Sequence, residues 1–222
     1  MHYPGGKAKT FHHVINLIPP HEVYIEPFLG IGSVMKSKIR ADIEIGIDLD
    51  ERLLNNEKLK NLGVRLINDD GIEFIDNYSF EGHEVIYCDP PYLPSTRKRK
   101  RVYRHDLDEA SHIRFLDIIT KTNAKIIISG YDNEIYRNYL EKWCLYKYQA
   151  KAHNGMREEC LWYNFKQPEK LHDYRYLGNN FRERQTIQRR LTRMVNRLEK
   201  LSPQERSFLS EWLNSNGELN AA

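Results

Sequence analysis

The segment Asp89-Pro90-Pro91-Tyr92 carries the residue types with the most definite chemical use in this chain. The Asp89 carboxylate is a hydrogen-bond acceptor, and the prolines have no backbone N–H, which leaves their carbonyls free as acceptors. An exocyclic amino group on a planar base fits this set, because it donates to Asp89 and to the Pro90 carbonyl while its ring stacks on Tyr92. Two such acceptors favour a more tetrahedral nitrogen, whose lone pair then points at an electrophile.

A second candidate set lies upstream, in the segment EPFLGIGSV at residues 26–34. Gly30 and Gly32 allow a tight turn and a close approach of the backbone to a ligand, as nucleotide-type cofactors require after a first strand. A Gly-x-Gly turn alone is more often ordinary turn chemistry, and the third glycine of a dinucleotide fingerprint is missing. Asp48 ends the next expected strand, 18 positions after Gly30, where a carboxylate can accept hydrogen bonds from ribose hydroxyls.

Further acidic residues follow the expected strands. Asp69 or Asp70 ends the third one, at the same edge of the sheet as Asp48, and open α/β sheets bind ligands at the carboxyl ends of their strands. Acidic residues at this edge would collect around a bound nucleoside. For Asp50 and Asp69 we expect only a turn or helix-start role, since aspartate favours both positions.

Basic residues cluster in two segments. Five follow Tyr92 closely and a sixth lies just beyond them: Arg97, Lys98, Arg99, Lys100, Arg101 and Arg104. Lysine and arginine neutralise phosphates with little regard to sequence, so we expect this loop to contact nucleic acid, the alternative being a solvated loop. Asn154 and Arg157, near the tip of an expected hairpin, are further candidates. The arginine-rich segment 181–201 fits phosphate contact, a dimer interface or a helical cap.

An α/β domain with a mainly parallel sheet must position these residues, because short β-rich runs alternate with helical patterns. The expected strands are residues 23–25, 43–47, 64–67, 85–88 and 125–129. The expected helices are residues 7–18, 34–39, 51–60, 72–77, 110–120 and 133–141. Asn154-Gly155 then predicts a terminal antiparallel hairpin, since both residues tolerate positive φ.

The domain organisation follows from a change in the sequence pattern after Gln167, where the alternation of strand-like and helical segments gives way to a polar segment and then to helices. Residues 1–167 form the expected main domain, and residues 168–222 a linker and a helical extension. Within the extension, Ser202-Pro203-Gln204-Glu205 predicts a fresh helix start with a capping box.

Composition narrows the class of protein. The 222 residues carry a net charge of +3, and no apolar run approaches the roughly 18 residues that a membrane helix needs. The N-terminal segment has no apolar core of a secretory signal, so we expect a cytoplasmic protein. Cys88, Cys144 and Cys160 are far apart and predict neither disulfides nor a zinc site, but buried thiols. No metal is implied.

Four motifs in order, YPGGK at 3–7, EPFLGIGSV at 26–34, GIDLDE at 46–51 and DPPY at 89–92, resemble the Dam-type (class D12, alpha-group) DNA adenine-N6 methyltransferases. The resemblance covers roughly residues 1–165 and implies a Rossmann-like methyltransferase fold, with S-adenosylmethionine as cofactor. It places Tyr3 and Lys7 along the cofactor site, and a phosphate-loop reading of Lys7 fails because Ala8 follows it where Ser or Thr is needed.

The same resemblance implies roles for the other motif residues. Phe28, Gly30 and Gly32 would wrap the methionine end of the cofactor, Asp48 would hold the ribose, and Asp70 would reach the cofactor adenine. Asp89 would border the cofactor and, with Pro90 and Tyr92, grip the target base. The target adenine would have to flip out of duplex DNA, because an amino group inside the stack is out of reach.

The chain departs from the family pattern in one respect. Asp70 and Asp89 are 19 positions apart, which leaves no room for the target-recognition domain that members commonly insert there. Site recognition must then be slight, giving a low-specificity enzyme, or come from the basic loop and the C-terminal helices. An RNA adenine-N6 methyltransferase and a catalytically idle nucleic-acid-binding protein are the alternatives. The sequence is compatible with a monomer or a homodimer. It is also compatible with a bacterial restriction-modification system or a phage as the biological setting.

Overall fold

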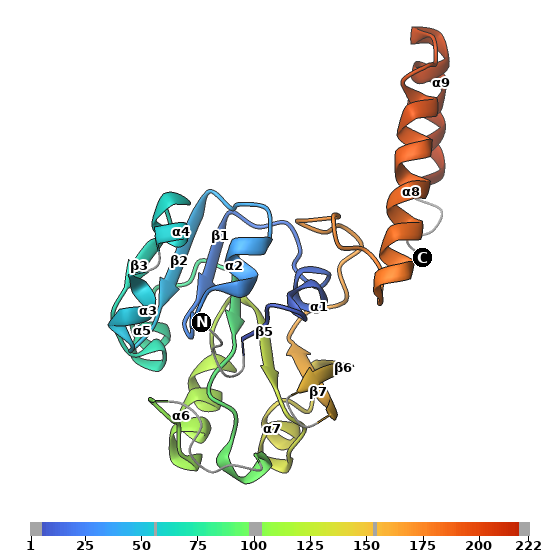
Figure 1. Cartoon of the computed structure of the whole chain (residues 1–222). Coiled ribbons are helices and arrows are strands. Elements are labelled where there is room, and N and C mark those ends of the chain that lie inside the picture. The colour runs from blue at the N-terminus through green and yellow to red at the C-terminus, as the bar shows by residue number, and fades with distance from the viewer. Residues whose placement is uncertain (1–5, 56, 98–103, 153–154, 218–222) are drawn as a thin grey trace. The chain divides into compact units, whose positions relative to one another are not determined.

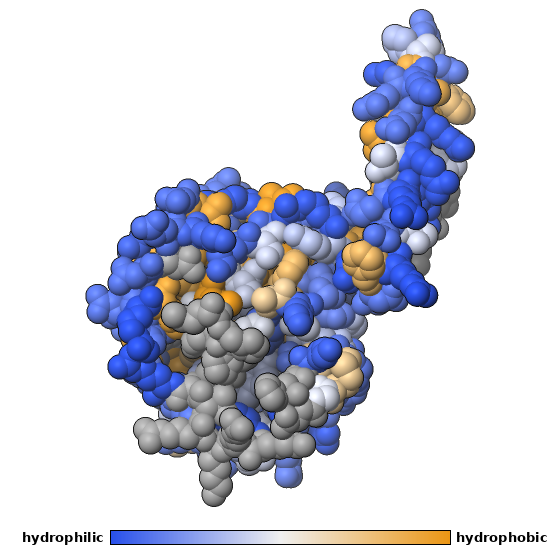
Figure 2. Space-filling model, viewed as in Figure 1, coloured by the Kyte–Doolittle hydropathy of each residue, from blue (hydrophilic) through white to orange (hydrophobic). Residues whose placement is uncertain are grey.

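The computed structural model describes residues 6–55, 57–97, 104–152 and 155–217. The chain divides into two compact units, Met1–Tyr174 and Arg175–Ala222. Hydrophilic side chains cover most of the face seen in Figure 2, with small hydrophobic patches between them. In the described part of the chain, no helix combines the length and apolar character needed to cross a bilayer.

A seven-stranded sheet in the order β3-β2-β1-β4-β5-β7-β6 forms the centre of the first unit (Figure 1). Its strands are β1 (Val23–Glu26), β2 (Ile43–Ile47), β3 (Arg65–Ile67), β4 (Glu84–Cys88), β5 (Lys125–Gly130), β6 (Cys144–Ala152) and β7 (Gly155–Tyr163). The first five pair in parallel, and the antiparallel β6-β7 hairpin is attached to β5. The predicted Rossmann-like methyltransferase fold, with its terminal hairpin, is confirmed.

The order of the strands reverses direction between β1 and β4, which are neighbours in the sheet. From β1 the chain proceeds outward to β2 and β3, then returns to add β4 and β5 on the other side. Open α/β sheets bind their ligands at such a switch point, outside the carboxyl ends of the strands. The segments after β1 and β4 therefore flank the expected ligand position.

Short helices connect the strands. They are α1 (Phe11–Ile15), α2 (Ser33–Ser37), α3 (Glu51–Leu54), α4 (Glu57–Asn61), α5 (Gly71–Asn77), the 3₁₀-helix η1 (Pro94–Thr96), α6 (Glu109–Ile119) and α7 (Glu134–Tyr139). Two expected helices are wrong in extent. The one over 7–18 is helical only in α1. The one over 51–60 is divided at Asn55, the C-cap of α3, because asparagine favours caps and turns over helix interiors.

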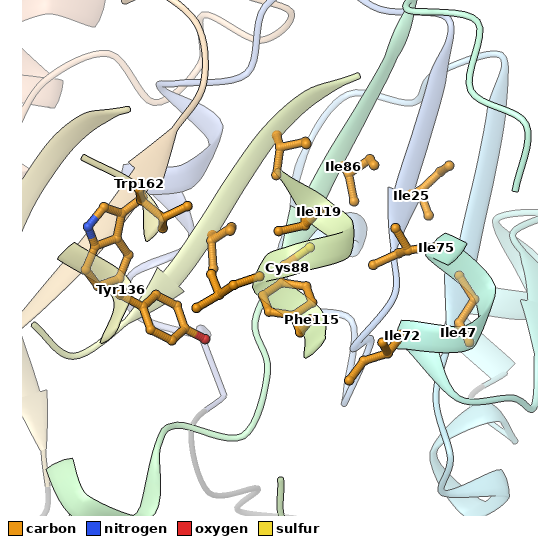
Figure 3. Packing of buried hydrophobic residues seen from close by; sticks show 14 of the residues in the cluster. Ile25, Ile47, Ile72, Ile75, Ile86, Cys88, Phe115, Ile119, Tyr136 and Trp162 are labelled. Carbon is orange, nitrogen blue, oxygen red and sulfur yellow. The ribbon is translucent and has the colours of Figure 1, made fainter. Parts of the chain in front are cut away.

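One face of the sheet packs against α5, α6 and α7. Their apolar side chains meet those of the strands in a single cluster, of which Figure 3 shows Ile25, Ile86, Ile72, Phe115 and Tyr136 among others. Most members of this cluster are almost completely buried. The strands that carry the candidate site are therefore anchored on this side by a close-packed core.

The opposite face is buried as well. Tyr24, Tyr87 and Ile127 alternate along their strands with the cluster residues and are also buried. The Lys38 ammonium at the end of α2 lies 4.1 Å from the centre of the Tyr24 ring, which places α2 over this face. Burial on both faces is typical of parallel sheets and explains why their strands read as continuous apolar runs.

The first unit ends beyond Gln167. Asp173 is fully buried, and its carboxylate accepts a hydrogen bond from the Ile39 backbone N–H at 3.1 Å. His172 donates its backbone N–H to the Ile18 carbonyl at 2.9 Å. The segment from 168 to 174 thus packs on the main domain, where the sequence suggests a linker. Cys144 is exposed, contrary to expectation, whereas Cys88 and Cys160 are buried.

The second unit contains α8 (Phe181–Leu198) and α9 (Pro203–Gly217). Asn180 caps α8 by accepting the Glu183 N–H at 3.0 Å. The predicted capping box at the start of α9 is confirmed: Glu205 N–H donates to Ser202 Oγ at 3.3 Å, and Ser202 N–H to Glu205 Oε2 at 2.7 Å. The predicted helical extension is therefore present.

Candidate active site

A tight loop follows β1 and forms one wall of the site. Gly30 and Gly32 have φ values of 53° and 62°, in the left-handed region that favours glycine. Gly30 N–H donates to Asp48 Oδ2 at 2.7 Å, and Asp50 N–H donates to Asp48 Oδ1 at 2.8 Å. Burial raises the pKa of Asp48, and these two backbone donors oppose the rise. Asp48 thus joins the loop to the end of β2.

Two glycines outside the quoted Gly-x-Gly turn also shape this wall. A Cβ on Gly46 would lie 2.8 Å from Leu29 Cδ2, and one on Gly71 would lie 2.0 Å from the Pro27 carbonyl oxygen. At Gly46 the Leu29 side chain would have to move aside, whereas at Gly71 the close atoms are backbone, so the loop after β1 can lie against α5 only because Gly71 lacks a side chain. Neither role is visible in the sequence, because the contacts join segments far apart in the chain.

The acidic residues after β2 and β3 largely serve local structure. Asp50 caps α3 and pairs with Arg52, whose guanidinium lowers the pKa of Asp50 to about 2. Asp69 accepts the Asp70 backbone N–H, and Asp70 caps α5 by accepting the Ile72 N–H at 2.7 Å. The turn and helix-start roles expected for Asp50 and Asp69 are therefore confirmed.

A cavity of about 230 Å³ lies between these segments. Five aspartate or glutamate side chains and three lysine or arginine side chains line it, together with the apolar surfaces of Phe28, Leu29 and Leu49. This donor set fits S-adenosylmethionine, because the acceptors suit a ribose and a cationic sulfonium group while the apolar wall suits an adenine ring. Phe28 itself packs edge-on against Phe115, with ring centres 5.6 Å apart.

Lys7 and Asp89 form an ion pair at the carboxyl end of β4, in which Lys7 is buried and the Asp89 side chain is 19% exposed. Lys7 Nζ donates to Asp89 Oδ1 at 2.8 Å and to Oδ2 at 2.9 Å, and Ser129 Oγ at the end of β5 donates to Oδ1 at 2.7 Å. Burial pulls the pKa of Lys7 down, but the facing Asp89 and Glu159 carboxylates outweigh it and hold that pKa well above its ordinary value. Burial raises the pKa of Asp89, with Lys7 and Ser129 opposing the rise.

Tyr92 belongs to the same network. Its hydroxyl accepts a hydrogen bond from Lys7 Nζ at 2.7 Å and donates to Glu159 Oε2 at 3.3 Å. Glu159 lies on β7 and also accepts from the Tyr148 hydroxyl at 2.7 Å. The Tyr131 ring packs edge-on against Tyr92, with ring centres 4.6 Å apart. The hydroxyl of Tyr92 is thus held by Lys7 and by Glu159 of the hairpin, and its ring by Tyr131, just after β5.

The structure brings most of the sequence-predicted site residues together around one cavity. Its lining includes Lys7, Phe28, Gly30, Asp48, Asp70 and Asp89. Tyr92 joins this group through Lys7. Gly32 is instead the N-cap of α2, where a Cβ would meet the Leu59 side chain at 3.0 Å. Tyr3 lies outside the described residues.

The candidate nucleic-acid contacts are more dispersed. Arg97 pairs with Asp106 at 2.7 Å and its side chain is only 5% exposed, so it is not placed to contact a phosphate. Arg104 is exposed at the rim of the cavity, 3.7 Å from Asp50 Oδ1. Arg157 donates to the Tyr131 hydroxyl at 3.2 Å, beside Tyr92. Lys98, Arg99, Lys100, Arg101 and Asn154 lie outside the described residues.

Sequence reasoning missed Ser129 and Glu159, which complete the Lys7-Asp89-Tyr92 network. Ser129 is fully buried near the end of a strand of isoleucines, and a lone hydroxyl in an apolar strand is a signal that could have drawn attention to it. Glu159 follows Glu158 in the sequence, and two neighbouring glutamates give no signal of a special role, so only the fold identifies Glu159.

Glu26, the last residue of β1, carries the most strongly displaced carboxyl in the cavity wall. Burial raises the pKa of Glu26 to about 8, although the Tyr24 hydroxyl donates to it at 3.0 Å. The folded protein therefore holds a proton that the unfolded chain releases above its own pKa near 4.5. The contribution of Glu26 to the free energy of unfolding thus falls as pH rises from about 4.5 to about 8.

We expect Glu26→Gln to remove this contribution, which amounts to roughly 3 to 5 kcal/mol across that range. Urea unfolding at pH 5 and pH 8 measures it, as the difference between variant and parent. His21 and His112, whose pKa values burial lowers to about 3 and 4, act in the opposite direction but equally in both proteins. Glu22→Gln, at an exposed neighbour, is the control, and an equal effect of both variants would contradict the assignment.

The comparison with protein families gives one match. The model of the family described as "D12 class N6 adenine-specific DNA methyltransferase" matches residues 45–156, which is half of the chain. The matched range includes Asp48, Asp70, the Asp89 to Tyr92 segment and most of the β6-β7 hairpin. No curated protein matches the chain.

Several solved structures are similar to this chain. An rRNA methylase from Streptococcus thermophilus is 17% identical with a TM-score of 0.47, over 69% of this chain and 93% of that one. A putative methyltransferase from Streptococcus mutans in complex with SAH is 17% identical with a TM-score of 0.49, over 69% and 95%. M. capricolum TrmK in complex with S-adenosyl-homocysteine is 12% identical with a TM-score of 0.48, over 94% of both chains.

Proposed function

Because the chain belongs to the D12 class of N6 adenine-specific DNA methyltransferases, we propose that it methylates the N6 amino group of adenine in duplex DNA. S-adenosylmethionine, its cofactor, supplies an electrophilic methyl group on a sulfonium sulfur. We propose that Asp48 holds the ribose, Asp70 the cofactor adenine and Phe28 to Gly32 the methionine end. Lys7 and Asp89 border this site at the side where the target base would enter.

In this proposal the chain's own residues prepare the target nitrogen. The Asp89 carboxylate and the Pro90 carbonyl accept its two N–H groups, so that its lone pair is no longer held in the plane of the base. Tyr92 stacks on the ring of the base. Once the nitrogen has taken the methyl group it carries one proton too many, and the Asp89 carboxylate accepts this proton and passes it to solvent. Lys7 and Ser129 keep the Asp89 carboxylate in place throughout.

The observation that carries the proposal is the position of Asp89. It follows β4 at the switch point of the sheet, lines the cavity and has donors fixed on both carboxylate oxygens. A carboxylate restrained in this way meets an incoming amino group without reorganisation, which is what electrostatic catalysis requires.

Reaching the target adenine costs a few kcal/mol of unstacking, so phosphate contacts must hold the distorted strand. We propose that the loop after Tyr92, with Arg104 and Arg157, supplies such contacts near the pocket. β3, α5 and β4 follow one another closely, which supports the proposal that no separate target-recognition domain is inserted there. We also propose a cytoplasmic location, because the substrate of this reaction lies inside the cell.

The test is to incubate the protein with labelled S-adenosylmethionine and with duplex DNA, single-stranded DNA or RNA of the same sequence. Digestion to nucleosides then identifies the product. We expect N6-methyladenine in duplex DNA as the main product. Label found only in RNA would favour the RNA adenine methyltransferase instead, and no transfer to any substrate would contradict the enzyme proposal.

A further inference from the structure

Helix α8 carries its arginines on one side. Five of its six arginines recur along the helix at spacings that return to the same side: Arg182, Arg189, Arg190, Arg193 and Arg197. Successive residues of an α-helix are rotated by about 100° and rise about 1.5 Å, so these five lie within roughly a third of the circumference and span about 22 Å. We name them the arginine stripe. All five are exposed.

The charge of the arginine stripe is uncompensated. Within the residues that the structure describes, no carboxylate lies within ion-pair distance of any of its five guanidinium groups. Arg193 does donate to the Arg189 backbone carbonyl at 3.3 Å, which leaves its charge unbalanced. Glu183, the one acidic residue of α8, accepts the Asn179 backbone N–H and belongs to the helix cap. Uncharged Thr, Asn and Gln side chains occupy most of the remaining polar surface of the helix.

The opposite side of α8 is apolar and has a different use. Ile187, Leu191, Val195 and Leu198 recur there at helical spacing, and Ile187 and Leu191 are the less exposed. Figure 2 shows hydrophilic side chains over most of the visible surface of this unit, with single hydrophobic ones between them. This apolar side is itself partly exposed, with Val195 at 50% and Leu198 at 48%. The two sides of α8 therefore differ in chemistry, and the arginine stripe needs an explanation of its own.

We propose that the arginine stripe binds the phosphate backbone of a nucleic-acid duplex, as a second contact surface on the same chain as the methyltransferase unit. Like-charged side chains held in a row repel one another, and a polyanion removes that repulsion. Double-stranded DNA carries one charge per roughly 1.7 Å of its axis, so a 22 Å row faces more phosphates than it has arginines. Such contacts carry no sequence information and add affinity alone.

This inference rests on the proposed function for the identity of the nucleic acid that is bound. It assigns the second unit a role in binding that nucleic acid. Two duplex-binding surfaces on one chain raise the effective concentration of each for the same DNA molecule. A compact methyltransferase without an inserted recognition domain would gain affinity in this way. The basic loop near Asp89 would then serve the flipped base, and α8 would keep the enzyme on the duplex.

The test compares two triple variants of the full-length protein in a duplex-binding titration at several salt concentrations. Arg189→Gln, Arg193→Gln and Arg197→Gln together remove three charges from the arginine stripe. We expect at least about a tenfold loss of affinity at 0.1 M salt, and a decrease of about 2 to 3 in the slope of log K against log salt. The matched control is Lys121→Gln, Lys142→Gln and Lys166→Gln, which removes equal charge from exposed sites near the amino ends of the parallel strands.

We expect the control triple to change affinity by less than about twofold, and both triples to keep the parent's helical circular dichroism and cofactor affinity. Equal losses in both triples, or no loss in the stripe variant, would overturn the proposal. So would unchanged DNA affinity with lost binding to anionic phospholipid vesicles, because amphipathic basic helices also bind membrane surfaces. Parallel titrations with DNA and RNA duplexes show which backbone is preferred. Intact stripe-dependent binding without methyl transfer would contradict the proposed function but not this inference.

Discussion

Replacing Asp89 with asparagine is expected to lower the rate of methyl transfer by about 10²- to 10⁴-fold, the range found when a positioned acid or base is removed. The amide keeps the shape of the side chain but carries no charge, and it presents one acceptor oxygen where the carboxylate presents two. With Lys7 and Ser129 already directed at this group, little acceptor capacity is left for a target amino group. Single-turnover transfer from labelled S-adenosylmethionine to duplex DNA measures the effect.

Cofactor affinity separates this role from a structural one. The loop and the strand ends that form most of the cavity do not depend on Asp89, so we expect cofactor affinity by calorimetry to stay within several-fold of the parent. Asp69→Asn is the matched control, because Asp69 is exposed, follows a parallel strand of the same sheet and only accepts a local backbone N–H. Transfer by Asp89→Asn at the rate of that control would refute the proposed role of Asp89.

Replacing Lys7 with methionine is expected to lower the free energy of unfolding by about 2 to 4 kcal/mol at neutral pH, because it leaves the largely buried Asp89 carboxylate without its partner. The pKa of Asp89, already raised by burial, should rise further without the ammonium. As the pH falls, activity that needs the anionic carboxylate should therefore be lost at a higher pH in the variant than in the parent. The destabilisation should also shrink toward low pH, where protonation of Asp89 removes the unpaired charge.

Urea unfolding from pH 5 to pH 8 and the pH profile of single-turnover transfer check both parts. Lys9→Met, at an exposed lysine two positions away, is the matched control and should change neither. The double variant Lys7→Met with Asp89→Asn should be less destabilised than the sum of the single variants, since the removed groups compensate each other. Additive losses and an unshifted pH profile would show that the pair is not coupled.

The sequence alone determined the fold and the principal strand ends. Alternation of apolar runs with helical patterns predicted each of the five parallel strands to within two residues. For β1, β4 and β5 the reason is that strands buried on both faces are continuous apolar segments. The Asn154-Gly155 dipeptide located the hairpin, and Ser202 with Glu205 located the start of α9, because both signals depend only on neighbouring residues.

The candidate site was predictable only in part. Asp48 and Asp89 were predicted to lie at one place, since the carboxyl ends of parallel strands share one edge of the sheet. The boundaries of short helices were less predictable, as at Asn55, because a local preference for a cap competes there with a weak helical pattern.

Only the tertiary structure decided which side chains hold the Asp89 carboxylate in place at the end of β4. Lys7 precedes Asp89 by 82 residues, and Glu159 follows it on the antiparallel hairpin. Their meeting depends on the order of strands in the sheet, which no local signal encodes. The same reason separates Arg97, engaged by Asp106, from the exposed arginines of α8: both occur in basic runs of the sequence, but burial and ion pairing are properties of the folded chain.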